Sequence, residues 1–547
     1  MNETKGVRST RLKFKAMRLA PLLAIIALLC WALASPVGSS PDDDFHLPSI
    51  WCAAGNKVNQ CQAVADQSQR AVPKTLGKER PCFARIAIRS AACQGASSAP
   101  GQDHLVTTTR GNFQGLYPSP YYQTMNLFVG PSVELSVVLM RLVNILLLVG
   151  LTTVLYVLLP VSRRLPLVWG LAISLVPLGM FLVASNNPSA WAVISAGTLW
   201  ISLVGYFESS GAKKAVLGII AALSTVLGAG ARADAAIYAV VAVVVAVLLT
   251  ASRDRRWVIS ALLPIGLVIT AAVFYLSAQQ SSVGASGIPG YPDGDPTHPL
   301  QWRYLFFTNL LNVPSLWAGV FGSWPLGWLD TVMPAAVWVA SLGCFAALVF
   351  TGLASMSIRK LLVVVTVLGA LVLIPVYVLV QSRVFIPVAV QPRYILPLVI
   401  MLAGVILWQA GGARLRLSKG QVITLVSTLS VVNAIALHFN MRRYITGSDV
   451  TDINLNTAVE WWWNFSAPPM TVWVAGSFSF AALLVILAKE TMLAPAALPH
   501  QETSSGCMSR DPAEAEPGLG PAGVDDGVSR ACGPGPAEPR AGIQFLT

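Results

Sequence analysis

Residues 133–159 read VELSVVLMRLVNILLLVGLTTVLYVLL, and this stretch decides the fold class. Its only charged residues are Glu134 and Arg141. A bilayer core of about 30 Å is crossed by roughly 20 apolar residues in a helix. The stretch is therefore long enough to span a membrane as a single helix.

The composition of all 547 residues agrees with that interpretation. Hydrophobic residues make up 54% of the chain and charged residues 11%, with a mean hydropathy of +0.63. Soluble proteins average about 25% charged residues, so soluble, disordered and fibrous classes are excluded. We predict an all-α polytopic membrane protein. The net charge of +12 is accounted for by where the basic residues lie relative to the predicted spans, so we predict no nucleic-acid partner.

About twelve stretches have the length and composition of transmembrane helices. They are residues 19–38, 133–159, 165–185, 189–207, 215–231, 234–250, 257–277, 332–352, 361–381, 394–411, 420–439 and 470–488. The fifth and sixth stretches are separated by Arg232-Ala-Asp234, and a hairpin that enters only one leaflet is an alternative for this pair.

Lysine and arginine indicate the orientation, because short cytoplasmic loops are enriched in them. Residues 1–18 are basic, and every second loop that follows is basic too. We therefore predict that both termini are cytoplasmic. Ala32-Leu33-Ala34 leaves a cleaved signal peptide as the alternative for the first span, although its apolar stretch is long for one.

The spans imply three regions along the chain. These are a basic cytoplasmic N-terminus (1–18), a transmembrane domain (19–490) and a disordered cytoplasmic tail (491–547) rich in Pro, Gly, Ala and Glu. Three large loops of the transmembrane domain are predicted outside the cytoplasm, at residues 39–132, 278–331 and 441–469.

The first outer loop contains Cys52, Cys61, Cys82 and Cys93. Four cysteines in an exported loop indicate two disulfides in an oxidising compartment, and three pairings are possible. A zinc site is the alternative, but the spacings match no familiar zinc motif.

Candidate catalytic residues follow the first span directly, in Pro41-Asp42-Asp43-Asp44-Phe45-His46. Adjacent carboxylates repel one another, so at least one pKa should rise. A carboxylate with a raised pKa beside His46 is typical of a general base. A solvated acidic turn that caps a helix is the alternative.

Several ionisable residues at the outer ends of spans are candidates for substrate binding. Arg141, Arg232 and Arg393 lie where the positive-inside bias does not account for them, and guanidinium groups bind phosphate oxygens bidentately. Snorkelling or a local ion pair, such as Arg232 with Asp234, is the alternative.

Two further polar segments are less specific. Asn186 begins an Asn-Asn-Pro turn at the junction of two spans. Asp293 and Asp295 are weak candidates for a divalent metal ion, because their Pro- and Gly-rich surroundings favour a plain turn.

Four short motifs resemble a bacterial membrane family known as domain of unknown function 2142. The motifs are Pro41-Asp42-Asp43-x-x-His46, the Pro/Tyr-rich residues 117–122, Asn186-Asn187, and Gln391-x-Arg393-Tyr394-x-x-Pro397. They occur in the family's order and cover roughly residues 20–490. The chain departs from the family where Asp43 replaces Glu, where Pro392 replaces Gly, and in its four-cysteine loop.

The resemblance implies a GT-C-like glycosyltransferase in a bacterial plasma (inner) membrane, since the family is bacterial and is grouped with those enzymes. Such an enzyme would transfer a sugar from a polyprenyl-phosphate donor to an envelope glycan or lipid acceptor at the outer leaflet. Asp42 or Asp43 would be the base and His46 would orient it. Arg393, Tyr394, Gln391, Arg232, Arg141 and Asn186 would bind substrate. A flippase or exporter of a lipid-linked saccharide, or a non-catalytic envelope-assembly protein, is the alternative.

Overall fold

The computed structural model describes residues 16–77, 80–95, 104–282, 301–386, 390–409, 415 and 417–493. Almost all of the tail predicted to be disordered lies outside these residues, as does most of the basic N-terminus.

Within the described residues, nine helical segments are long and apolar enough to cross a membrane. They are α6 (Val133–Leu158), α9 (Ser189–Phe207), α10 (Gly211–Ala229), α11 (Ala233–Thr250), α12 with α13 (Arg255–Ser260 and Leu262–Ser277), α16 (Ala335–Gly352), α17 (Ile358–Gln381), α19 (Lys419–Ile445) and α20 (Pro469–Thr491). Each overlaps a predicted span. Both α10 and α11, the pair with the hairpin alternative, are among them.

The other three predicted spans are short or interrupted, so twelve uninterrupted spans are not confirmed. The first corresponds to α2 (Ala20–Leu33) and the tenth to α18 (Pro392–Leu407). At 1.5 Å per residue, helices of these lengths span only about 21 and 24 Å.

The third predicted span is broken into α7 (Val161–Leu175) and α8 (Leu178–Val183). Pro177 causes the break. Its ring disfavours the helical conformation in the preceding residue, and Val176 is extended with φ −90° and ψ 127°. This proline stands inside an apolar stretch, which hides the break in a hydropathy pattern.

Helix α9 lies at the centre of the helix bundle, where it packs against α7, α10, α11 and α18. Its residues from Ser189 to Gly205 are all buried. Helices α7 and α18 approach closely through Gly170 and Gly404, since a Cβ at Gly170 would lie 2.9 Å from the Cα of Gly404. Small residues at such crossings let helix backbones approach in a membrane bundle.

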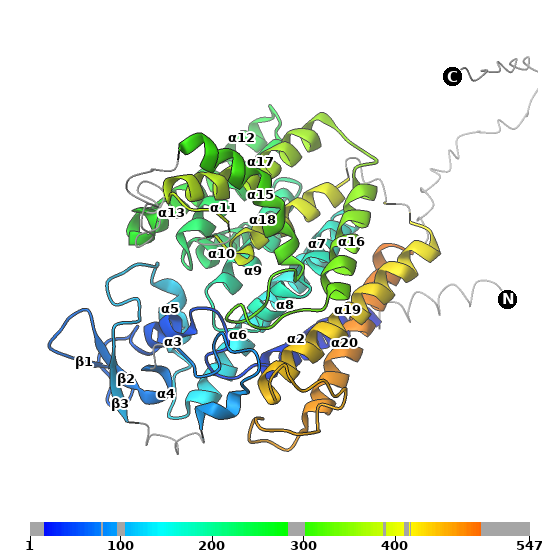
Figure 1. The fold of residues 1–547 in the computed structure, drawn as a ribbon. Coiled ribbons are helices and arrows are strands. Elements are labelled where there is room, and N and C mark those ends of the chain that lie inside the picture. Colours follow the sequence, from blue (N-terminus) through cyan, green and yellow to red (C-terminus); the bar gives the residue numbers. More distant parts are fainter. Residues whose placement is uncertain are drawn as a thin grey trace, which may run out of the picture. The chain divides into compact units, whose positions relative to one another are not determined.

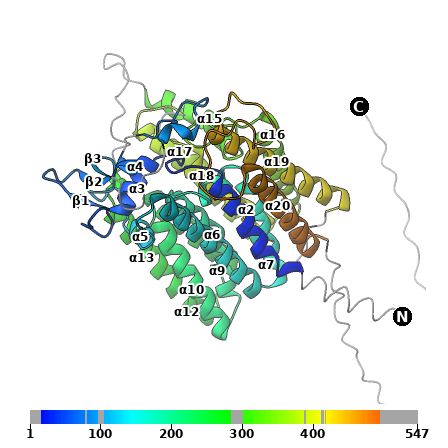
Figure 2. The same ribbon diagram turned by 90° about the horizontal axis from the view of Figure 1, so that it is seen from below.

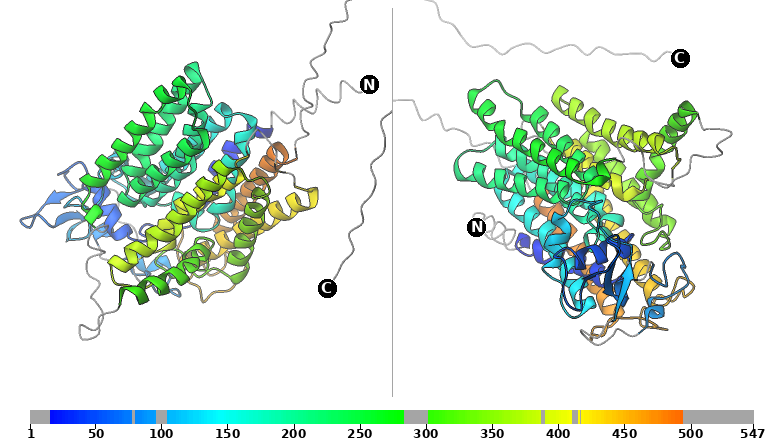
Figure 3. Two further views of the ribbon diagram at one scale, coloured as in Figure 1. Left: turned by 90° about the horizontal axis from the view of Figure 1, so that it is seen from above. Right: turned by 90° about the vertical axis from the view of Figure 1, so that its left-hand side faces the viewer.

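The first large loop, residues 39–132, departs from the all-α prediction because it contains a small sheet. Strands β1 (Gln62–Ala63), β2 (Arg70–Pro73) and β3 (Leu105–Thr108) are antiparallel and ordered β1-β2-β3. The sheet lies together with α3 and α4 at one end of the bundle (Figures 1 and 3). We call this the Asp42 end, because Asp42 directly precedes α3.

Short helices complete the loops. They are α3 (Asp43–Trp51), α4 (Lys74–Gly77), η1 (Ala91–Gln94), α5 (Pro120–Asn126) and η2 (Gln279–Ser282). A longer helix, α15 (Trp302–Val320), also lies in a loop. Helix α15 occupies the second large loop and packs against α17 and α18.

The prediction of two disulfides is confirmed, and the zinc alternative is wrong. Cys52 is bonded to Cys61, and Cys82 is bonded to Cys93. Of the three possible pairings, the structure therefore has the one that joins neighbours in sequence.

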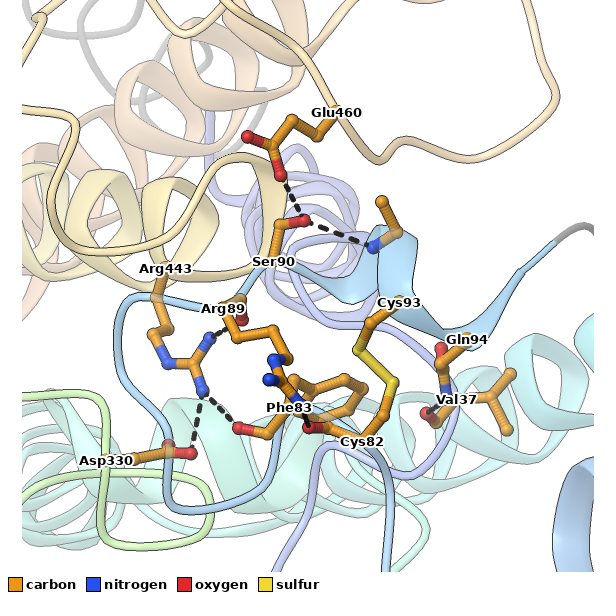
Figure 4. The surroundings of a disulfide bond; sticks show 11 residues. Val37, Cys82, Phe83, Arg89, Ser90, Cys93, Gln94, Asp330, Arg443 and Glu460 are labelled. Atoms are coloured by element: carbon orange, nitrogen blue, oxygen red, sulfur yellow. Dashed lines mark hydrogen bonds and ion pairs between the residues drawn. A yellow bond between two sulfur atoms is a disulfide. The ribbon is translucent and has the colours of Figure 1, made fainter.

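The second disulfide belongs to a loop that a buried arginine fixes to the bundle (Figure 4). From the end of α19, Arg443 donates to the carbonyl oxygens of Phe83 and Arg89, at 2.8 and 2.7 Å. The same guanidinium pairs with Asp330 at 2.8 Å, and Asp330 also accepts from the backbone N–H of Arg85 at 2.9 Å. Residues of the first large loop therefore meet Asp330 of the second and Arg443 of the third. These contacts anchor the first loop at the Asp42 end.

Candidate functional site

Asp42 occupies an unusual backbone conformation at the start of α3. Its φ of 61° and ψ of 20° lie in the left-handed region, which is costly for residues other than glycine. Its carbonyl oxygen accepts from the N–H groups of Phe45 and His46, at 2.9 and 2.8 Å. These bonds of the first helical turn hold the residue in place. The carboxylate remains 39% exposed.

Arg393 binds this carboxylate from the start of α18. Its Nη2 lies 2.6 Å from Oδ2 of Asp42 and 3.0 Å from the hydroxyl oxygen of Tyr394. Its Nη1 donates to the carbonyl oxygen of Pro41 at 3.3 Å. The Arg393 side chain is only 4% exposed, and its Nε has no hydrogen-bond partner within the described part of the chain. A buried cation at a helix N-terminus is unfavourable by itself, so the Asp42 charge is needed to stabilise it.

A second guanidinium reaches the cluster from the loop after β3. Arg110 binds Asp44 bidentately, with Nε to Oδ2 at 2.9 Å and Nη2 to Oδ1 at 3.1 Å. Its Nη2 also lies 4.0 Å from Oδ1 of Asp42, and its side chain is 42% exposed. The sequence analysis missed Arg110, which stands in no motif and is one of several basic residues in the loop.

Arg232 approaches from the turn between α10 and α11. It pairs bidentately with Asp234, at 2.8 and 3.0 Å, as the local-pair alternative predicts. Its guanidinium also lies 4.7 Å from the ring centre of Tyr394 and 5.7 Å from that of Tyr117. The Tyr394 ring therefore contacts two cations, because Arg393 lies 5.0 Å from the same ring centre. We call Asp42, Arg110, Arg232, Arg393, Tyr117 and Tyr394 the Asp42 cluster.

His46 lies buried behind the cluster and is neutral. Its Nδ1 is 3.0 Å from the hydroxyl oxygen of Tyr122, and its ring makes an edge contact with Tyr117. Burial lowers the pKa of His46 to about 3, although the charge of Asp42 acts in the opposite direction. A neutral imidazole here acts as a hydrogen-bonding group and not as a cation.

Asp43 is buried, unlike the partly exposed Asp42 beside it. It is 1% exposed, and its Oδ2 accepts from the backbone N–H of Ser40 at 3.0 Å. Burial raises the pKa of Asp43 to about 7, against the lowering effects of Arg141 and Ser40. The pKa of Asp44 is also raised, again mainly by burial. The predicted rise in pKa therefore occurs, but burial contributes more than the repulsion between carboxylates.

Asn186 and Arg141 lie beside the chain that leads to Asp42. Asn186 is fully buried, and its amide nitrogen and oxygen have no partner within the described part of the chain. The neighbouring Asn187 donates to the carbonyl oxygen of Pro41 at 2.8 Å. Arg141 is fully buried and donates to three carbonyl oxygens at 2.6 to 2.8 Å. Those carbonyls belong to Ala32, Ser35 and Pro36.

Gln391 is the residue before α18, and its side chain does not cap that helix. Asp293 and Asp295, the weak metal candidates, lie outside the described residues. In the described ranges, no group of three His, Cys, Asp or Glu side chains is placed to hold a metal ion.

Four separate sequence motifs thus converge on Pro41 and Asp42. The Pro41 carbonyl accepts from Asn187 and Arg393, and the tyrosines of residues 117–122 enclose His46. The result is an accessible Asp42 carboxylate beside two guanidinium groups, while Arg232, paired with Asp234, contacts the neighbouring Tyr394 ring. Such an arrangement can bind an anionic group and place a carboxylate next to it.

Comparison with known proteins finds the same family as the motifs. The sequence model of the family described as "Predicted membrane protein (DUF2142)" matches residues 25–402. No curated protein and no solved structure matches the chain.

Proposed function

The chain belongs to this family of predicted membrane proteins, and on that premise we propose that it is a membrane glycosyltransferase of the GT-C type. The donor would be a polyprenyl-phosphate sugar, and the acceptor an envelope glycan or lipid at the outer leaflet. The observation that carries the proposal is the partly exposed carboxylate of Asp42 beside Arg393 and Arg110, with Arg232 on the Tyr394 ring that Arg393 also contacts.

The arginines provide the donor's phosphate site in this proposal. Guanidinium groups match phosphate oxygens geometrically and keep their charge at any physiological pH. Arg110 is the most accessible of the three, with a 42% exposed side chain. Arg393 is almost fully buried, which makes its charge act in a medium of low dielectric constant.

Asp42 is the base in this proposal, in preference to Asp43, because only Asp42 has an exposed carboxylate. Burial raises the pKa of Asp42, but the charges of Arg393 and Arg110 lower it by more, and the net pKa is about 2. A carboxylate with so low a pKa is a weak base. A donor phosphate would compete for Arg393, and the weakened ion pair would let the pKa of Asp42 rise.

The transfer step follows from these positions. The acceptor hydroxyl gives its proton to Asp42 while its oxygen attacks the anomeric carbon of the sugar. The bond from that carbon to the phosphate oxygen breaks, and the electron pair leaves with polyprenyl phosphate. Arg393 and Arg110 stabilise the added negative charge, which is a preorganised electrostatic contribution. Direct displacement inverts the anomeric configuration.

The low pKa of Asp42 also supports a second candidate function. A carboxylate that remains ionised and paired is suited to binding without proton transfer. The protein would then be a flippase or exporter of a lipid-linked saccharide, and the same cluster would hold its head group.

The test measures sugar transfer by the full chain in lipid nanodiscs, with a panel of radiolabelled polyprenyl-phosphate sugars and a cell-envelope acceptor fraction. Asp42→Asn removes the base and should lower the transfer rate by about 10²–10⁴-fold, the usual contribution of general base catalysis. Asp66→Asn is the matched control, because Asp66 is an exposed carboxylate of the same loop with only local partners.

Full transfer by the Asp42→Asn variant would overturn the assignment of Asp42 as the base. If no donor is transferred by the wild-type chain but the lipid binds saturably, the flippase is the better account.

A further inference from the structure

A deep apolar groove lies at the end of the bundle opposite to Asp42. Its walls are α2, α6, α7 and α20, with one residue of α8, and its volume is about 770 Å³. Figure 2 shows α2 between α6 and α20, and both helices contact it. The volume is within the roughly 300–1,000 Å³ of small-molecule binding sites.

The groove is as deep as one leaflet of a bilayer. On α6 it follows residues 148–157, and on α20 residues 480–490. At 1.5 Å per residue these segments are about 14 and 15 Å long, which is half of a 30 Å bilayer core. The side chains along this depth are almost entirely aliphatic or aromatic, so the walls match a hydrocarbon chain.

The end of the groove that lies farthest from Asp42 is charged. Arg18, Arg164 and Glu490 line it, and they give it a net positive charge. The Arg164 guanidinium lies 4.7 Å from the ring centre of Tyr156, which orients it. A guanidinium at the end of an apolar groove suits an anionic group.

We propose that this groove binds an anionic phospholipid, with an acyl chain between α2, α6 and α20 and its phosphate at Arg164 and Arg18. The one-leaflet depth fits an acyl chain, and the two arginines favour an anionic head group over the repulsion from Glu490. The site is independent of the proposed transfer reaction, because the Asp42 cluster lies at the other end of α2.

The experiment uses the full chain in nanodiscs that contain a small fraction of phosphatidylglycerol with a photoreactive diazirine on its acyl chain. Phosphatidylcholine with the same acyl chain is the comparison. After illumination, the labelled peptides are identified by mass spectrometry. We expect peptides of α2, α6 and α20 to be labelled by phosphatidylglycerol about fivefold or more above phosphatidylcholine, because each arginine contributes about that factor.

Two matched pairs of variants test the two parts of the site. Thr153→Trp fills the groove and should abolish the labelling, whereas Val154→Trp places the same bulk on the exposed face of α6 and should not. Arg164→Ala should lower phosphatidylglycerol labelling about fivefold, whereas Arg359→Ala, an exposed arginine at the start of α17, should leave it unchanged.

Equal labelling by both lipids in the wild-type chain would identify an ordinary annular contact and overturn the proposal. So would labelling that persists in Thr153→Trp, or a cross-link showing that another segment of this chain fills the groove. None of these outcomes bears on sugar transfer, which has its own test above.

Discussion

Two arginine–aspartate pairs at the Asp42 end have similar geometry and different surroundings. Arg393 lies 2.6 Å from Asp42, and Arg443 lies 2.8 Å from Asp330. Both arginine side chains are buried, at 4% and 2% exposed. The carboxylates differ, since Asp42 is 39% exposed and Asp330 only 3%.

The partners of each pair explain the difference. Arg443 also donates to the carbonyl oxygens of Phe83 and Arg89 in the disulfide-containing loop. Asp330 accepts from the backbone N–H of Arg85 in that loop and from the hydroxyl of Thr331. That pair is closed and holds the loop in place. The pair at Asp42 has an exposed side, where Arg110 lies at 4.0 Å. An ion pair therefore indicates a binding site only where one of its members still faces solvent.

Breaking the closed pair should have the largest effect on stability. Asp330→Ala leaves the buried charge of Arg443 without its partner, and such losses cost about 3–5 kcal/mol. We expect the free energy of unfolding in mixed micelles to fall by this amount. Asp66→Ala, at an exposed position, should change it by less than about 0.5 kcal/mol. A similar small change in Asp330→Ala would mean that the loop is held by other contacts.

The buried neighbour of the open pair should make stability depend on pH. Burial raises the pKa of Asp43 to about 7, so the folded protein holds a proton that the unfolded chain releases near pH 4. The stability from this proton is complete below pH 4 and is lost as the pH rises to about 7. Its size follows from the shift, at roughly 2–4 kcal/mol.

The measurement compares unfolding free energies of the wild-type chain and Asp43→Asn between pH 4 and 8. The asparagine has no proton to lose, so the wild-type chain should lose stability relative to the variant across this range. Parallel profiles would show that Asp43 does not carry the buried proton.

The smallest of these effects concerns ligand binding by the open pair. Arg393→Lys keeps the charge but replaces the planar fork, whose Nη1 binds Pro41 and whose Nη2 binds Asp42 and Tyr394, with a single nitrogen on a flexible chain. We expect the dissociation constant of the polyprenyl-phosphate donor to rise about 10–100-fold, which corresponds to one or two charge-assisted hydrogen bonds. Arg303→Ala, an exposed arginine on α15, is the control. An unchanged dissociation constant in Arg393→Lys would place the phosphate elsewhere.

Much of the fold could be predicted, because apolar runs reveal membrane helices one at a time. Helices α6, α9 and α11 lie close to their predicted ranges. The break at Pro177 and the sheet β1-β2-β3 were not predicted. A proline within an apolar run leaves hydropathy unchanged, and strands of two to four residues carry too little pattern.

The candidate site was predicted in part. The fold brings Asp42, Arg232 and Arg393 together. The sequence analysis had selected these residues because they are charged and lie at the ends of predicted spans. The sequence analysis could not choose between Asp42 and Asp43, since adjacent residues differ in burial only after packing. It also missed Arg110, because contact with Asp44 depends on the path of the loop.

The amino-acid sequence by itself determined the membrane class, most of the helices and the presence of two disulfides. These depend on local composition, since about 20 apolar residues suffice for one span and cysteines in an exported loop become oxidised. Only the tertiary structure decided which carboxylate stays accessible and which guanidinium groups surround it. Burial and ion pairing depend on residues hundreds of positions apart, such as Asp42 and Arg393, and no local pattern encodes their distance.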